Sequence, residues 1–164
     1  MDDVAQLATG LQSNDAATRQ QAAERLAQLA EDASPAAAAL VASCDDSDES
    51  ALEWKVAALE SLGAPPAEQS NELISLLASD CELSRYWAAT LLGRLGEAAG
   101  QAATALSARL SADEGNAAGE RAAWALAQMG PAAAPAKEAL RTAAGSARPR
   151  MARFAQQALE AIGG

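Results

Sequence analysis

Histidine is absent from this chain of 164 residues, and aromatic residues make up only 3% of it. Without histidine, no Ser-His or Cys-His catalytic pair and no His-ligated zinc or iron site can form. Valine, isoleucine, phenylalanine and tyrosine are scarce, so β-strands have little material. No apolar run approaches the roughly 20 residues that span a bilayer. We therefore expect no catalytic residues of the common types, no cofactor, and no membrane partner.

The chain is also poor in cysteine, with only Cys44 and Cys81. Two isolated cysteines are typical of reduced thiols in a cytosolic protein, and they cannot build a zinc site alone. The segment Met1-Asp2-Asp3-Val4 has neither the basic region nor the apolar run of a signal peptide. These features predict a cytoplasmic location.

Basic residues are few, and their distribution is uneven. The formal net charge is −10. Residues 1–82 hold 16 acidic and 3 basic side chains, whereas residues 83–164 hold 6 and 9. A nucleic-acid surface needs clustered lysine and arginine, so we expect no nucleic-acid partner. The charge gradient along the chain predicts a monomer or a weak head-to-tail oligomer.

Alanine and leucine are abundant, and leucine recurs at a fixed period. The chain contains 47 alanines, which favour helix because they lose no side-chain entropy on folding. Two series of leucines repeat every 33 or 34 residues: Leu7, Leu40, Leu73, Leu106 and Leu140, and Leu26, Leu59, Leu92, Leu126 and Leu159. A period of this length is typical of stacked repeats that share one core.

Each period reads as two helices. The expected first helices cover residues 15–29, 48–62, 82–95, 116–129 and 149–162, and several end at a glycine such as Gly96. The expected second helices cover residues 34–44, 67–78, 98–110 and 134–144, and residues 2–12 form a lone capping helix. The sequence thus predicts a single all-α domain, 1–164. It would be a right-handed α-solenoid of about ten helices, with four full helix pairs and a capping helix at each end.

The strongest motif is Trp87-Ala88-Ala89-Thr90-Leu91-Leu92-Gly93-Arg94-Leu95-Gly96, preceded by Ser84-Arg85. This pattern resembles the HEAT-repeat superfamily, particularly the HEAT-like repeats of phycocyanobilin lyases, and implies an armadillo-like superhelix. The arginine of that family near the start of the first helix matches Arg19 and Arg85. Leu52, Gly119 and Ala152 stand at the equivalent positions, so we expect the polar ladder between repeats to be broken.

The resemblance leaves several activities open. Relatives that hydroxylate a modified lysine need His-Glu iron ligands, which this chain lacks. Relatives that act as DNA glycosylases use a basic groove, which the acidic balance disfavours. A lyase-type or chromophore-handling factor, with carboxylates or Cys44 and Cys81 as active groups, remains an alternative, as does a structural self-assembling unit.

Three groups of side chains are candidate partner-binding sites. Tyr86 and Trp124 are expected on the outer side, near Arg85, Arg94 and Arg121, and aromatics beside arginine are typical of interface hot spots. A basic run at the carboxyl end could dock an acidic partner, or could simply be solvated: Lys137, Arg141, Arg148, Arg150 and Arg153. The second helices should line a shallow groove with small side chains: Ala38, Asn71, Thr104, Glu138, Ala42, Ser75, Ala108 and Thr142.

Two other clusters have simpler interpretations. The acidic residues Asp45, Asp46, Asp48 and Glu49 favour helix capping over a metal site, because the pattern lacks the glycine and distal glutamate of a calcium loop. Trp54 and Trp87, one repeat apart, favour packing between repeats. The sequence as a whole predicts a non-catalytic module that binds a protein or peptide partner through its surface.

Overall fold

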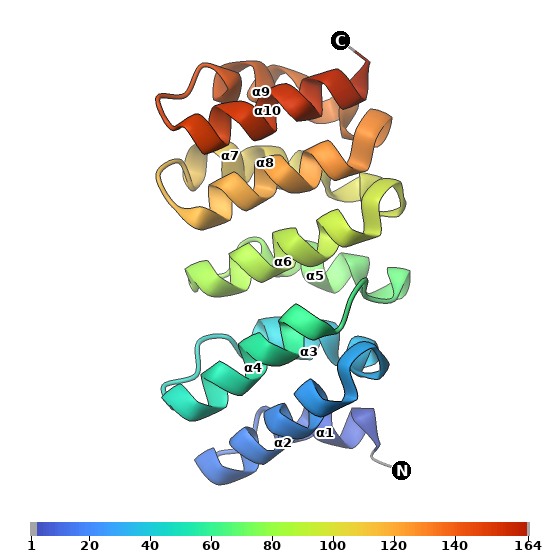
Figure 1. Cartoon of the computed structure of the whole chain (residues 1–164), viewed down its shortest axis with the longest axis vertical. Coiled ribbons are helices and arrows are strands. Elements are labelled where there is room, and N and C mark those ends of the chain that lie inside the picture. Colours follow the sequence, from blue (N-terminus) through green and yellow to red (C-terminus); the bar gives the residue numbers. More distant parts are fainter. Residues whose placement is uncertain (1–2, 164) are drawn as a thin grey trace.

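The computed structural model describes residues 3–163, and every element within them is helical (Figure 1). Asp2, the first residue of the expected capping helix 2–12, lies outside the described residues. The α-helices are α1 (Val4–Gly10), α2 (Ala16–Leu29), α3 (Ala37–Ala42), α4 (Glu49–Ser61), α5 (Ser70–Leu76), α6 (Glu82–Leu95), α7 (Ala103–Ala112), α8 (Ala117–Met129), α9 (Lys137–Ala144) and α10 (Pro149–Ile162). No helix in this part of the chain is long and apolar enough to cross a membrane.

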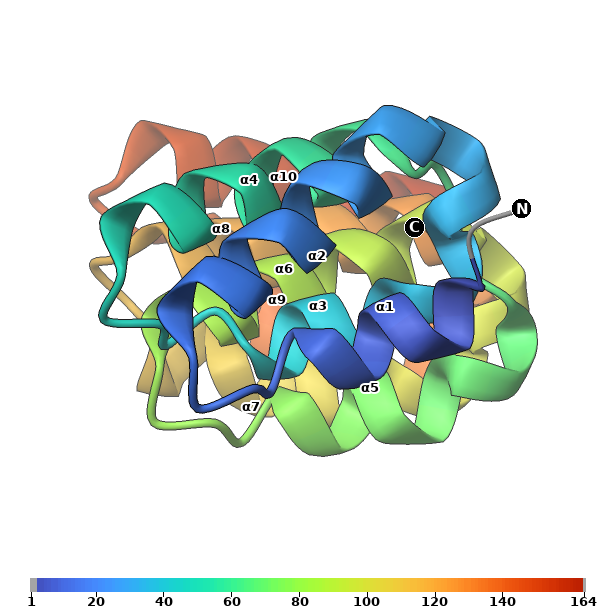
Figure 2. The same cartoon turned by 90° about the horizontal axis from the view of Figure 1, so that it is seen from below.

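The helices form two layers, which Figure 2 shows from one end of the stack. The first-helix layer consists of α2, α4, α6, α8 and α10, and the second-helix layer of α1, α3, α5, α7 and α9. Within the layers, α2 packs on α4, α6 on α8, and α7 on α9. The predicted α-solenoid of helix pairs with a capping helix at each end is confirmed.

Both leucine series lie in the core between the layers. Their inner members are fully buried, and each leucine contributes about 1.5–3 kcal/mol on burial. The end members Leu7 and Leu159 are only partly buried, because one side of each terminal helix has no neighbouring repeat. The fully buried leucines are Leu40, Leu73, Leu106, Leu140, Leu26, Leu59, Leu92 and Leu126.

The second helices are shorter than the sequence predicts. The α-helix starts only at Ala37, Ser70, Ala103 and Lys137, because a 3-10 segment precedes it in each repeat. These segments are Ala30–Ala36, Ala67–Gln69, Gly96–Ala102 and Gly130–Ala136. The tighter 3-10 coil reverses the chain over a few residues, and Pro35 and Pro135 lie inside it.

The residue that ends each first helix has a positive φ angle. Gly63, Gly96 and Gly130 adopt φ values of 71°, 59° and 56°, as the glycine series predicts. Ala30 occupies the equivalent position in the first repeat with φ 49°, and it is the only non-glycine residue with positive φ among residues 3–163. Its Cβ makes this backbone conformation costly.

The acidic segment after α3 caps α4, as expected. The carboxylate of Asp48 accepts a hydrogen bond from the Ala51 amide at 2.8 Å, and Asp15 accepts one from the Thr18 amide at 2.9 Å. No three residues of the Cys, Asp and Glu types in the described chain converge as metal ligands.

A ladder of ion pairs runs along the loops between repeats. Arg19 donates to Asp46 at 2.7 Å, and Arg85, two repeats later, donates to Asp113 at 2.8 Å. Each arginine also donates to carbonyls of its own preceding loop, those of Ser13 and Ser79. The α2–α4 and α6–α8 junctions are therefore held by the same arrangement of an ion pair and an arginine–carbonyl hydrogen bond.

The expectation of a broken ladder is wrong at the last junction. Gly119 lacks the guanidinium, but Arg148 donates to Glu120 at 2.7 Å from the following repeat. A Cβ at residue 119 would lie 2.3 Å from the Asp113 carbonyl oxygen, so the loop occupies the space that a side chain would need. The ladder thus continues with different partners.

Asp46 also neutralises a buried lysine. The Lys55 ammonium lies 2.6 Å from Asp46 and donates to the Ser43 carbonyl at 2.9 Å, and its side chain is only 1% exposed. The hydrogen bond from Arg19, with further help from Lys55, holds the pKa of the Asp46 carboxyl well below its usual range. Removing Asp46 would leave the buried Lys55 ammonium without its counter-charge.

The junction between α4 and α6 differs from the others. These two helices lie visibly apart in Figure 1, whereas α2 packs on α4 and α6 on α8. The expectation of a broken ladder holds here, because Leu52 supplies no ion pair. Instead, the Ser84 hydroxyl donates to the Val41 carbonyl at 2.9 Å, and α3 packs against α6.

Candidate functional site

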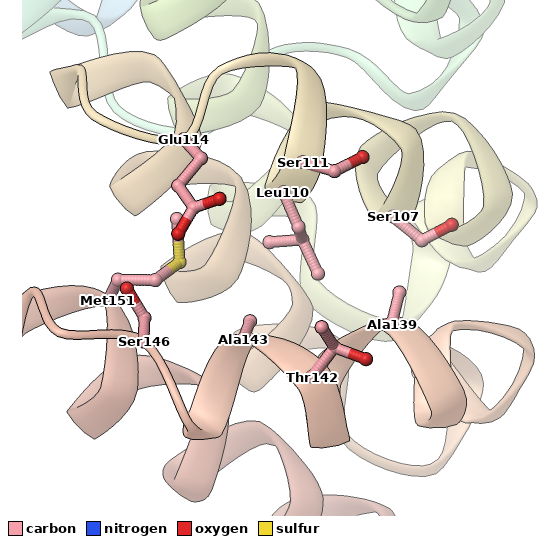
Figure 3. A pocket seen from close by; sticks show the side chains of 9 residues that line it. All are labelled: Ser107, Leu110, Ser111, Glu114, Ala139, Thr142, Ala143, Ser146 and Met151. Atoms are coloured by element: carbon pink, nitrogen blue, oxygen red, sulfur yellow. The ribbon is translucent and has the colours of Figure 1, made fainter.

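The second-helix layer contains a pocket of about 220 Å³ between α7 and α9 (Figure 3). Leu110 and Met151 form its apolar floor, and both are buried. Hydroxyls and one carboxylate surround the floor. The complete lining is Ser107, Leu110, Ser111, Glu114, Ala139, Thr142, Ala143, Ser146 and Met151.

Two of the hydroxyls in this pocket make local contacts with the backbone. The Ser107 hydroxyl donates to the Thr104 carbonyl at 2.8 Å, and the Ser146 hydroxyl accepts from the Arg148 amide at 3.2 Å. The pocket offers hydroxyl groups around an aliphatic floor.

Most of the groove residues expected from the repeat register are exposed on the second-helix layer: Asn71, Thr104, Glu138, Ala42, Ser75, Ala108 and Thr142. Thr142 lines the pocket itself. The prediction for Ala38 is wrong, since this residue is only 3% exposed. The Gln69 side chain covers it by accepting from the Ala38 amide at 2.9 Å and donating to the Pro35 carbonyl at 2.7 Å.

On the first-helix layer, Tyr86 and Trp124 meet through Arg121, one of the three arginines expected near them. The Arg121 guanidinium lies 4.8 Å from the centre of the Tyr86 ring and 4.9 Å from that of Trp124. It also donates a hydrogen bond to the Tyr86 hydroxyl. The spacing of 35 residues between Tyr86 and Arg121, close to one repeat, was the available signal.

Trp124 is less exposed than the sequence predicts. Its ring packs on Gly93 of α6, where an added Cβ would lie 2.4 Å from a ring carbon. Trp124 is partly buried, so part of its surface belongs to the packing between α6 and α8. A small hollow of about 130 Å³ remains beside it, with Tyr86, Arg121, Arg150 and Phe154 in its wall.

Arg94 has an internal role. Its guanidinium donates to the carbonyls of Leu59 at 2.9 Å and Gly63 at 3.0 Å, so it caps the carboxyl end of α4. It also lies 5.8 Å from the centre of the Trp87 ring, which is buried as predicted for a residue that packs between repeats. Arg94 is thus placed to hold α4 and α6 together rather than to contact a partner.

The basic run at the carboxyl end does not form one continuous patch. Arg141 pairs with Glu138 on α9, and Arg150 lies 3.7 Å from Glu120. Arg153 stacks on Phe154 at 5.3 Å. Lys137 is half-buried at the start of α9. Much of this charge is therefore engaged within the chain.

The two cysteines lie side by side across a repeat junction, although they occupy different places in their repeats. The Cys81 thiol donates to the Cys44 carbonyl at 3.6 Å, and both thiols are free. Burial raises the pKa of the Cys44 thiol to about 12, and the nearby Cys81 adds to the effect. Cys44 is therefore a poor nucleophile near neutral pH.

No family model matches this sequence. No curated protein matches it either. Solved structures do. The complex of CpcE and CpcF of phycocyanin lyase from Nostoc sp. PCC7120 has a TM-score of 0.68 at 22% identity, and the match covers 99% of this chain and 66% of that one.

Two designed proteins are also similar in structure to this chain. A designed armadillo repeat protein in complex with the peptide (KR)4 has a TM-score of 0.66 at 19% identity, covering 97% of this chain and 81% of that one. An engineered protein has a TM-score of 0.64 at 23% identity, covering 99% and 80%. At these identities the likeness concerns the fold. The chain is an all-α solenoid with the fold of the HEAT and armadillo repeat proteins.

Proposed function

We propose that this protein is a non-catalytic interaction module that binds a peptide segment of a partner protein across α7 and α9. The observation that carries the proposal is the pocket with the Leu110 and Met151 floor, within a surface of small side chains on the second-helix layer. Such a surface lets a peptide backbone approach closely, while the pocket accepts one apolar side chain. Hydroxyls at the rim can pair with peptide amides and carbonyls.

The solved relatives support a partner of this kind. One is a designed armadillo repeat protein bound to a peptide, and another is a complex of two lyase chains. A cytoplasmic setting suits two cysteines that form no disulfide. The buried, weakly acidic Cys44 thiol speaks against a cysteine-dependent reaction.

The test is selection of random 12-residue peptides displayed on phage against the wild-type chain. Selected peptides are then measured with Ser111→Trp, which fills the pocket from its exposed rim, and with Gln156→Trp on α10 as a matched control. We expect binding to weaken by about tenfold in the first variant and to change little in the second. Peptides that bind both variants as well as wild type would contradict the proposal.

A further inference from the structure

The first-helix layer has a second opening, at the junction where α4 and α6 stand apart. A cleft of about 420 Å³ lies there, formed by Leu83 of α6 and a row of α4 residues. Leu52, Val56 and Leu83 are half-buried apolar side chains. The α4 residues are Glu49, Leu52, Glu53, Val56, Ala57 and Glu60.

The repeat register distinguishes this junction from the others. One residue after the first four leucines of the second series stand Ala27, Glu60, Gly93 and Ala127. Three residues before these leucines stand Ala23, Val56, Ala89 and Ala123. At the α6–α8 junction, Gly93 allows Trp124 to lie directly against the helix. In α4, Val56 and Glu60 replace these small residues, and both line the cleft.

The rim of the cleft is acidic on one side. Glu49, Glu53 and Glu60 are exposed along α4, and within residues 3–163 none of their carboxylates forms an ion pair. Glu49 and Glu53 are one turn apart, and like charges at this spacing repel by a few tenths of a kcal/mol. A cation bound between them would remove that repulsion.

One buried donor beside the cleft also lacks a partner. Trp87 lies one turn after Leu83 on α6, so the two share a face of that helix. Its indole Nε1–H is buried and makes no hydrogen bond within the described chain. Buried donors are nearly always paired, so this one marks a junction whose polar groups are not fully satisfied.

We propose that the α4–α6 cleft docks a basic amphipathic helix of a partner protein. An apolar ridge of that helix would cover Leu52, Val56 and Leu83, and lysine or arginine side chains would pair with the glutamates. Helix-in-groove binding uses this combination of an apolar stripe and charged flanks. The surface lies on the opposite layer from the α7–α9 pocket, so the inference does not rest on the proposed function.

A partner is favoured over a second copy of the chain. The basic residues at the carboxyl end already have acceptors or stack within their own chain: Arg141 on Glu138, Arg148 and Arg150 on Glu120, and Arg153 on Phe154. Docking them into the cleft of another copy would break these contacts. A separate helix with unpaired cations has no such cost.

The probe is a labelled synthetic 15-residue helix with leucines on one face and lysines on the other, used with the full chain. We expect it to bind wild type, and charge reversal by Glu53→Lys with Glu60→Lys to weaken binding by about tenfold or more. The matched control is Glu68→Lys with Glu72→Lys, which makes the same charge change at exposed residues at the start of the second helix of the same repeat. It should weaken binding by less than about twofold.

A second variant tests the apolar part. Val56→Asp leaves the rim intact and should also reduce binding of the lysine–leucine helix, and a peptide with serine in place of leucine should bind poorly to wild type. Unfolding midpoints establish that each variant is folded. If both charge-reversed pairs weaken binding equally, the peptide is held by general electrostatic attraction to the acidic chain, and the proposal is wrong. The proposal is also wrong if Ser111→Trp abolishes binding of the peptide and Val56→Asp leaves it unchanged.

Discussion

The α6–α8 and α4–α6 junctions join similar helices in different ways. Leu59 and Leu92 are both fully buried, so the leucine core is the same on both sides. At α6–α8, Gly93 admits Trp124 and the Arg85–Asp113 ion pair fastens the loop edge. At α4–α6, neither feature exists, and an acidic cleft opens. In an alanine-rich solenoid, closeness between repeats depends on a few small side chains rather than on the leucines.

The largest expected effect concerns the Arg19–Asp46 ion pair of the α2–α4 junction, which has no counterpart at the α4–α6 junction. Asp46→Ala at the α2–α4 junction leaves Lys55 buried without its counter-charge, which should destabilise the fold by about 3–5 kcal/mol. Urea unfolding measures the loss. Asp45→Ala, at an exposed neighbour, should change stability by less than about 0.5 kcal/mol. Similar costs at both positions would mean that the ion pair contributes little.

A pair of matched substitutions compares the two junctions directly. Gly93→Leu forces a side chain into the Trp124 ring and should cost about 3 kcal/mol. Glu60→Leu places the same side chain at the equivalent exposed position and should cost less than about 1 kcal/mol. Thermal and urea unfolding of both variants check the difference. Equal costs would show that α4 and α6 are as tightly packed in solution as α6 and α8.

The ladder also predicts how stability depends on pH. Arg19 and Lys55 lower the pKa of Asp46, and for Asp113 the hydrogen bonds from Arg85 and Asn116 outweigh the opposing effect of burial on the pKa. A lowered pKa in the folded state contributes stability above the unfolded value of about 4, and that stability is lost as pH falls below it.

Urea unfolding at pH 6, 5, 4 and 3 should therefore show a loss of stability toward acid. Asp46→Asn should be less stable at pH 6 and show a shallower loss, because one of the carboxyls that must be protonated is gone. A variant with the wild-type slope would show that Asp46 does not contribute to the acid sensitivity.

The smallest expected effect concerns Ala30, in the turn that follows α2. Ala30 holds a positive φ where later repeats have glycine, so Ala30→Gly should stabilise the fold by about 1 kcal/mol. Ala17→Gly in the exposed part of α2 should instead destabilise it by about 1 kcal/mol. A loss of stability in Ala30→Gly would mean that the turn is not strained in solution.

Much of the fold follows from the sequence because its signals are local and repeated. The first helices at 82–95 and 149–162 begin and end where predicted, since the glycine after each helix and Pro149 at the start of the second act on neighbouring residues. The second helices begin later than predicted, because 3-10 and α geometry differ little in residue preference. Ala38 was wrongly expected to be exposed, because the Gln69 side chain that covers it comes from the next repeat.

The candidate sites were less predictable. Tyr86 and Trp124 were recognised with three nearby arginines, but the sequence did not show that Arg121 joins the two rings or that Arg94 caps α4. The α4–α6 cleft escaped notice because Val56 and Glu60 look like ordinary helix residues. Their role becomes visible only when they are compared with Ala89 and Gly93, which stand at the equivalent positions of the next repeat.

The sequence by itself determined the all-α class, the repeat length and the buried leucine series, because helix propensity and periodic burial are properties of each repeat. The tertiary structure decided which neighbours close tightly, which charges are consumed in ion pairs and which surfaces stay open. These outcomes depend on side chains about 30 residues apart meeting across a junction, and a difference of a few atoms there changes the distance between whole helices.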